Sequence, residues 1–175
     1  NTSYNYFGGL YSYTDQEFRG FNIVNETLSD NTTISHYFHQ NKQLKGKEYL
    51  TITYDSNNNI FSKTENNYNF TYKNNNSIFI AQLKSSSNYL YDGINETSTI
   101  TNISYKYDNY SNIISKISYG NIFISGDEKY ENYSFVYNNS LWILDKPVKY
   151  TLFNSNNEKL RETKSESVCC VYEPE

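Results

Sequence analysis

The stretch from residue 121 to 153 constrains the fold more than any other part of the sequence. It contains the single tryptophan, Trp142, and a run over residues 131–137 in which aromatic and polar side chains alternate. Three turn signals interrupt the stretch: Gly126 with Asp127, Asn138 with Asn139, and Asp145-Lys146-Pro147. Alternation bounded by Gly, Asn and Pro is typical of half-buried antiparallel strands that are joined by tight turns.

The same pattern recurs along the chain and predicts about 10–12 strands without helical crossovers. Residues 78–83 are apolar on both faces and are predicted to form the most buried strand. Thr14 and Glu17 fit a helix capping box, which predicts at most two helical turns. The other expected strands cover residues 4–13, 21–28, 32–39, 48–54, 68–73, 99–107, 113–119, 148–153 and 159–172.

The composition favours sheet over helix. The chain has 20 Tyr and 10 Phe but a single Ala and no Met, so good helix formers are scarce. Short connections force successive strands to pair antiparallel. We therefore predict an all-β antiparallel meander in a single domain over residues 1–175, with residues 173–175 as a tail.

A meander of this length must close or stack, because an open sheet leaves two edges that invite aggregation. We favour an up-and-down barrel of the lipocalin-like kind over a β-sandwich, since a sandwich usually needs longer Greek-key connections. The segment Phe7-Gly8-Gly9-Leu10-Tyr11 resembles the glycine and aromatic start of lipocalin-like barrels, although it lacks their Trp. The resemblance covers five residues and implies no site. Residues 1–13 are a candidate exchangeable N-terminal strand.

Charge and hydrophobicity argue against a nucleic-acid partner and against a membrane-spanning helix. The formal net charge is −4 and the lysines are scattered, so the electrostatic footprint of a nucleic-acid-binding protein is missing from the sequence. No apolar run approaches the roughly 18 residues of a membrane-spanning helix.

The sequence starts at Asn1 without Met, which fits either a processed mature form or an arbitrary starting point.

The number of potential N-glycosylation triplets suggests that the protein is exported. Ten N-x-[ST] triplets occur, whereas the composition predicts about five by chance. They predict an N-glycosylated extracellular or cell-surface protein, although the codon bias of an AT-rich genome also enriches Asn. The triplets start at Asn1, Asn25, Asn31, Asn69, Asn75, Asn95, Asn102, Asn109, Asn132 and Asn138.

Candidate reactive residues are few. His36 and His39 are the two histidines, and their odd spacing in an expected strand places them on opposite faces, so we predict no metal site. Cys169 and Cys170 are expected to form a disulfide, either with each other or with another chain. The sequence contains no nucleophile elbow, P-loop or dinucleotide fingerprint, so we predict no catalytic residue and no cofactor.

The abundance of tyrosine leaves two functional hypotheses. The first is an exported, non-enzymatic β-barrel that holds a small apolar or aromatic ligand among inward Tyr, Phe and Ile side chains. The second is a structural surface glycoprotein, or a filament or coat subunit, that assembles by strand pairing. An enzyme is the third choice. The candidate ligand-binding residues are Tyr54, Phe70, Tyr72, Ile80, Tyr105, Tyr133, Phe135, Trp142 and Tyr150.

Overall fold

The computed structural model describes residues 1–73, 78–92 and 98–165, and every regular element in these ranges is a β-strand. The described part of the chain holds no helix with the length and apolar character needed to cross a membrane. The strands are β1 (Ser3–Phe7), β2 (Tyr11–Ser12), β3 (Glu17–Phe18), β4 (Ile23–Thr27), β5 (Thr33–Phe38), β6 (Glu48–Tyr54), β7 (Ile60–Lys73), β8 (Ile78–Tyr91), β9 (Ser98–Tyr107), β10 (Ile113–Asn121), β11 (Lys129–Asn138), β12 (Ile143–Asn154) and β13 (Lys159–Lys164).

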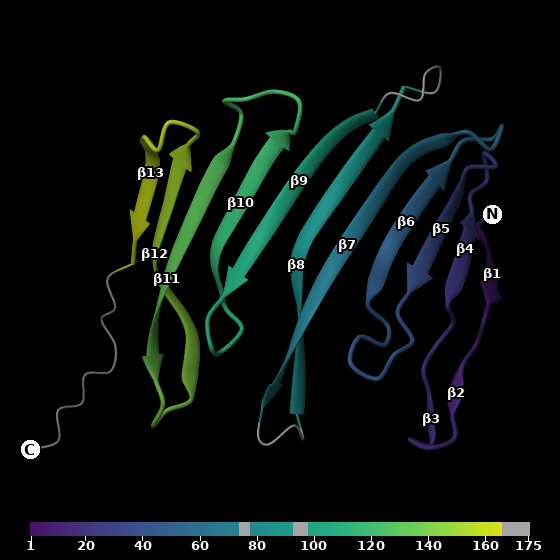
Figure 1. The fold of residues 1–175 in the computed structure, drawn as a ribbon, viewed down its shortest axis with the longest axis horizontal. Helices are drawn as coiled ribbons and strands as arrows, with labels where there is room; N and C mark the ends of the chain where they lie inside the picture. Colours follow the sequence, from purple (N-terminus) through teal and green to yellow (C-terminus); the bar gives the residue numbers. More distant parts are fainter. Residues whose placement is uncertain (74–77, 93–97, 166–175) are drawn as a thin grey trace, which may run out of the picture. The chain divides into compact units, whose positions relative to one another are not determined.

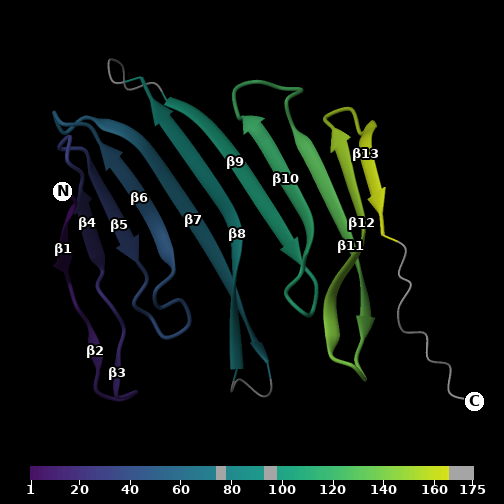
Figure 2. The same ribbon diagram turned by 180° about the vertical axis from the view of Figure 1, so that it is seen from behind.

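Eleven of these strands form one sheet in which neighbours along the chain are neighbours in space. Its order is β1-β4-β5-β6-β7-β8-β9-β10-β11-β12-β13, and β2 pairs with β3 in a separate two-stranded sheet (Figure 1). Figure 2 shows the same succession of strands from behind. The predicted all-β antiparallel meander is therefore confirmed.

The sheet is not closed into a barrel, so the predicted lipocalin-like closure is not confirmed. β1 pairs with β4 and β13 pairs with β12, and the described residues of β1 and β13 do not pair with each other. A closed barrel of this size needs one face that is apolar enough to fill an interior. Rows across this sheet are mixed instead: Asn25, Ser35, Ile52 and Lys63 are in register across β4 to β7.

The chain divides into two compact units. The first comprises Asn1–Asn102 with Asn121–Phe123, and the second comprises Ile103–Gly120 with the chain from Ile124 onward. The strands range in length from two residues, in β2 and β3, to 14 residues, in β7 and β8.

Few side chains are buried. Among the described residues, Leu44 is the one buried apolar residue, at 7% exposure, and Ser35 and Thr151 are the buried polar residues. Residues 78–83 were expected to be the most buried strand, but none of them is buried and Ile78 is 52% exposed. Apart from the β2–β3 hairpin, the described strands form no second sheet that would cover them.

The N-terminal segment is an interrupted hairpin. Gly8 has a φ of 63°, and a Cβ at this position would meet Cβ of Asn22 at 3.0 Å, so the bend between β1 and β2 requires glycine. The helical turns predicted at Thr14 to Glu17 are wrong. This segment is the turn of the β2–β3 hairpin, in which the Asp15 amide donates to the Ser12 hydroxyl at 3.3 Å.

One turn geometry recurs at four hairpins. In residues 55–59, the first residue donates its amide to the carbonyl of the fifth, and the fourth has a positive φ. This is a three-residue loop whose last residue is left-handed. The same bonds close residues 28–32, 108–112 and 154–158, and the left-handed residues are Asn31, Asn58, Ser111 and Asn157.

The turn signal Asp145-Lys146-Pro147 was misinterpreted, because all three residues lie within β12. Pro147 stands opposite Phe135 at a register shift between Ser134 and Phe135. Proline lacks the amide hydrogen that a regular ladder uses, so it is tolerated at a bulge.

Candidate ligand-binding site

Side chains from β6, β7 and β8 form the floor of an open cavity in the first unit. Leu50 is in register with Glu65, and Glu65 with Ser87. Two residues further along β7, Asn67 stands opposite Ser85. Since alternate residues of a strand share a face, Glu65 and Asn67 project on the same side of the sheet.

The loop between β5 and β6 forms one wall. Its ends are joined by two bonds: the His39 amide donates to the Lys47 carbonyl at 2.9 Å, and the Gly46 amide donates to the His39 carbonyl at 3.0 Å. Inside the loop, the Leu44 amide donates to Oδ1 of Asn41 at 2.8 Å, and the Leu44 side chain is buried.

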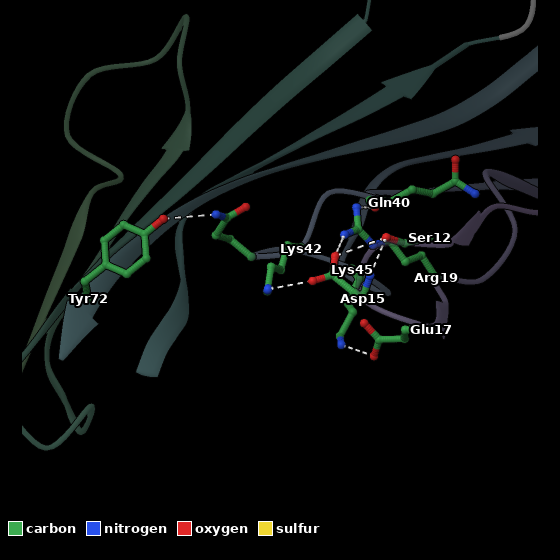
Figure 3. A network of polar contacts seen from close by, with 9 residues as sticks. Ser12, Asp15, Glu17, Arg19, Gln40, Lys42, Lys45 and Tyr72 are labelled. Atoms are coloured by element: carbon green, nitrogen blue, oxygen red, sulfur yellow. Dashed lines mark hydrogen bonds and ion pairs between the residues drawn. The ribbon is translucent and has the colours of Figure 1, made fainter. Parts of the chain in front are cut away.

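A polar network holds this loop against the N-terminal hairpin (Figure 3). Asp15 accepts bonds from Lys42 Nζ at 2.7 Å, from the Ser12 hydroxyl at 3.1 Å and from Arg19. Lys45 pairs with Glu17, also on the hairpin. Hydrogen bonding to Lys42 and Ser12 lowers the pKa of Asp15 to about 2, so its carboxylate stays charged.

Two amides of the loop extend the network. Gln40 Nε2 donates to the carbonyls of Gly8 at 2.6 Å and Gly20 at 2.9 Å, and both accepting residues flank the hairpin. Gln43 Nε2 donates to the Tyr72 hydroxyl on β7 at 3.0 Å. The loop is therefore held on both sides, by the N-terminal hairpin through Asp15 and Lys42 and by Tyr72 of β7 (Figure 3).

Three rings line the cavity beside the loop. The His39 ring lies 4.7 Å from the Tyr49 ring and 6.2 Å from the Tyr68 ring, the latter edge to face. The pairing of Tyr37 with Leu50 and of Phe38 with Glu48 leaves Tyr49 as the extra residue of a bulge. Bulges redirect side chains, which explains why Tyr49 reaches His39.

The cavity has a volume of about 520 Å³. The Glu48 carbonyl fixes two of its residues, because it accepts bonds from Asn66 Nδ2 at 3.1 Å and from the Tyr68 hydroxyl at 3.2 Å. Besides Leu44 and Leu50, the lining side chains are aromatic or polar: His39, Tyr49, Tyr68, Glu65, Asn66, Asn67, Ser85 and Ser87.

The one carboxylate that lines the cavity, that of Glu65, is already paired with a cation. Glu65 pairs with Lys63 Nζ at 3.0 Å and accepts a bond from the Tyr89 hydroxyl at 3.0 Å. The hydrogen bond from Lys63 lowers the pKa of Glu65, so the carboxylate is ionised at neutral pH. Burial lowers the pKa of His39, which favours the neutral imidazole. The cavity is thus close to electrically neutral.

A second cluster lies in the second unit. Glu131 accepts bonds from Lys116 Nζ at 2.7 Å, from the Tyr133 hydroxyl at 2.7 Å and from the Tyr150 hydroxyl at 3.2 Å. Burial alone would raise the pKa of Glu131, but these donors lower it. Burial and the bond to Glu131 raise the pKa of Tyr133. The carboxylate is saturated by donors, which is the arrangement of a structural network.

The predicted ligand-binding residues do not gather at one place. Tyr133 and Tyr150 pack with ring centres 5.2 Å apart beside Glu131, and Tyr105 is near enough to contribute to the raised pKa of Tyr133. Elsewhere they are spread along the strands: Tyr54 ends β6, Phe70 and Tyr72 form an edge-to-face pair on β7, Ile80 lies opposite Thr71, Phe135 lies opposite Pro147, and Trp142 is 82% exposed.

The residues that do line the cavity were not predicted. The sequence singles out His39 only as a possible metal ligand. It gives no reason to separate Tyr49 and Tyr68 from the other tyrosines of the chain. The bulges at Tyr49 and between Asn67 and Tyr68 bring them together. Strict two-residue alternation cannot find such a site, because a bulge shifts the face to which the next side chain points.

The remaining candidates have separate surroundings. His36 Nδ1 lies 2.6 Å from Glu48 Oε1, away from the ring contacts of His39. Within residues 1–73, 78–92 and 98–165, no three potential metal ligands come together. Cys169, Cys170, Asn75 and Asn95 lie outside the described residues.

The other triplet asparagines differ in exposure. Asn31, Asn69, Asn109 and Asn132 are exposed, and Asn102 and Asn138 are half-buried. Asn25 lies in β4, and its Oδ1 is buried without a hydrogen-bond partner among the described residues.

No family model matches this sequence, and no curated protein matches it. Solved structures do resemble the fold. The TcdB2-TccC3 complex without its hypervariable C-terminal region gives a TM-score of 0.69 at 14% identity, covering 89% of this chain and 12% of that chain. The TcdB2-TccC3-Cdc42 complex gives 0.66 at 13% identity with the same coverage. A Photorhabdus luminescens Tc holotoxin pore gives 0.67 at 14% identity, covering 87% of this chain and 12% of that chain. The chain thus spans about an eighth of each of these much longer chains, and the likeness is one of fold alone.

Proposed function

We propose that this chain is a non-enzymatic structural protein that assembles with a second copy by strand pairing along β1. The observation that carries the proposal is the edge itself. β1 pairs with β4 on one side, and no described strand pairs with its other side. Alternate residues of an edge strand direct their amide and carbonyl groups away from the sheet, where a further strand can bond to them.

The two edges of the sheet differ in charge. β1 reads Ser-Tyr-Asn-Tyr-Phe and carries no charged side chain, whereas β13 reads Lys-Leu-Arg-Glu-Thr-Lys. Charged side chains, lysine above all, protect an edge strand against pairing with other chains. β13 has this protection, with Glu162 held by Lys159 and Lys164, and β1 lacks it.

This asymmetry favours pairing of β1 with β1 over pairing of β1 with β13. An antiparallel register centred on Asn5 is two-fold symmetric and uses the same surface of both copies. It would set Tyr4 of one copy beside Tyr6 of the second, an aromatic cross-strand pair of the kind that stabilises sheets. Tyr4, Tyr6 and Phe7 are 51%, 54% and 50% exposed, so each has apolar surface left to bury.

We also propose that the protein acts outside the cell as a glycoprotein. The excess of N-x-[ST] triplets supports this, together with the exposure of Asn31, Asn69, Asn109 and Asn132. A glycan needs an acceptor amide that is open to solvent.

The assembly is tested at Asn5. In the symmetric register two copies of residue 5 face each other, so Asn5→Lys sets like charges opposite one another and should convert the dimer to a monomer in sedimentation velocity. Asn5→Asp should do the same, and mixing the two variants should restore a dimer. The matched control is Thr163→Lys on β13, which should leave the dimer intact.

Three results would overturn this assembly. A wild-type chain that stays monomeric at every concentration would remove its basis. A concentration-dependent ladder of oligomers would show head-to-tail pairing of β1 with β13. Loss of the dimer in Thr163→Lys but not in Asn5→Lys would place the contact at the other edge.

A second candidate function is ligand binding, favoured by the cavity of about 520 Å³ beside His39. This volume is within the range of small-molecule sites. The enclosed barrel interior that we first expected is not formed, so a ligand would bind in this open cavity between the β5–β6 loop and β7.

A further inference from the structure

We infer that the cavity beside His39 binds a neutral carbohydrate. This inference rests on the second proposed function, ligand binding, and gives its chemical class. The cavity combines ring faces with polar groups that lack partners and carries no uncompensated charge. Each of these features selects against a different kind of ligand.

The rings supply apolar contact for the carbon-bound hydrogens of a sugar. The Tyr49 and His39 rings lie 4.7 Å apart and tilt by 39°, and Tyr68 meets His39 at 80°. Aromatic side chains offer a large, rigid contact area with little loss of conformational freedom. The wall that carries His39 is held by Gln40 and Gln43, so the rings are positioned before a ligand arrives.

The polar groups supply hydrogen bonds for hydroxyls. The structure records no side-chain partner for Asn67 or Ser85 within the described residues, and Asn66 uses its Nδ2 but not its Oδ1. Amides and hydroxyls can both donate and accept, which matches the dual character of sugar hydroxyls. A purely apolar ligand would leave these groups unsatisfied, and each would cost binding energy.

The charges argue against an ionic ligand. Glu65 is already paired with Lys63, and Lys63 is also 4.0 Å from the centre of the Tyr89 ring. Burial favours neutral His39. An anion would meet the Glu65 carboxylate, and a cation would compete with Lys63 for it. A neutral polyhydroxylated ligand fits without displacing either partner.

The experiment is a titration of the full chain followed by amide NMR. The probes are glucose, galactose, mannose and N-acetylglucosamine with their di- and trisaccharides, and the uncharged N-phenyl-1-naphthylamine represents the apolar class. We expect one sugar series to shift the amides of residues 66–68 and 85–87 in a saturable manner. Tyr49→Ala and Asn67→Ala should each weaken this binding at least about fivefold. Tyr13→Ala removes an equally large ring at a site that is 85% exposed, and should change it less than about twofold.

The outcomes separate the two claims. If no sugar binds but the naphthalene probe shifts the same amides, the cavity is a ligand site and the carbohydrate assignment is wrong. If neither shifts them, ligand binding fails as well. If a sugar binds with equal strength to Tyr49→Ala and to the wild type, its site lies elsewhere and the inference is overturned. Unchanged amide spectra away from the mutated site show that each variant is folded.

Discussion

The carboxylate of Asp15 links two segments of the first unit, the N-terminal hairpin and the β5–β6 loop. It joins Ser12 and Arg19 of the N-terminal hairpin to Lys42 of the β5–β6 loop (Figure 3). Hydrogen bonds to Lys42 and Ser12 depress its pKa from 3.8 to about 2. The folded chain therefore binds this proton less readily than the unfolded chain does, and the network favours folding wherever Asp15 is ionised.

The sign of the pH dependence follows. The contribution of Asp15 is complete above its unfolded pKa of 3.8 and is lost as the pH falls through about 2. We predict a carboxyl carbon titration of Asp15 with a midpoint near 2, with parallel amide shifts in residues 39–47. The variant Asp15→Asn should show those shifts already at neutral pH. A midpoint near 4 in the wild type would contradict the network.

At the residue scale, prediction from sequence succeeded where a side chain followed the regular alternation. The triplet residues Asn69 in β7 and Asn132 in β11 are exposed, as glycan acceptors must be. It did not identify Tyr49 as a cavity residue, and the helical turns expected from Thr14 and Glu17 are wrong. A bulge redirects Tyr49, and cross-strand pairing of Tyr11 with Phe18 makes the second segment a hairpin turn. Both failures arise because tertiary pairing overrides a local pattern.

At the scale of elements, the four similar hairpin turns are the clearest regularity of the chain. Two of these turns each begin with an aspartate whose side chain accepts hydrogen bonds from the loop amides. Oδ1 of Asp55 accepts the amides of Asn57 and Asn59, and Oδ1 of Asp108 accepts those of Tyr110 and Asn112. Each loop then needs a left-handed fourth residue, a conformation that costs Asn less than Ser.

Ser111 is therefore the strained member of the set, with a φ of 74°. We predict that Ser111→Gly stabilises the chain by about 1 kcal/mol, measured as a higher urea midpoint at constant slope. The matched control is Ser115→Gly in β10, where the backbone is a regular strand and glycine should cost about 0.5–1 kcal/mol. Equal destabilisation by both substitutions would show that residue 111 carries no strain.

The positions of the strands were predictable because short loops and alternating side chains leave little freedom. The boundaries of β6, Glu48–Tyr54, match the prediction, and β9 begins one residue earlier. Pro147 was misleading, because a proline in a sequence argues for a turn unless a bulge accommodates it. The sequence also carries a signal for three of the four similar hairpin turns, an Asp or Asn four residues before the last residue: Asp55, Asp108 and Asn154.

At the scale of the whole molecule, closure could not be predicted. A meander that closes and one that stays open have the same local pattern, and they differ in whether one face is apolar throughout. In this chain Lys63 and Glu65 lie on a face that also carries Ile52 and Leu50. The strand order can be predicted from the sequence. Whether the two edge strands pair with each other depends on the mixture of side chains on each face of the sheet.

The pattern of glycosylation is the last prediction, and it tests export and the strand arrangement together. Asn31 lies in an exposed turn and Asn132 on the exposed face of β11, so both should carry glycans when the chain is secreted from eukaryotic cells. Asn25 should remain unmodified, because β4 is flanked by β1 and β5 and the amide oxygen of Asn25 is buried.

The measurement is glycopeptide mass spectrometry before and after enzymatic removal of N-glycans, with occupancy compared site by site. Asn25 is the internal control, since it has the same sequence motif as the exposed sites but a different environment. Full occupancy at Asn25 would mean that β4 is not an inner strand during export, because the amide must reach the modifying enzyme. Empty sites at both Asn31 and Asn132 would remove the main support for an extracellular location, since the excess of triplets would then reflect the richness of the chain in asparagine.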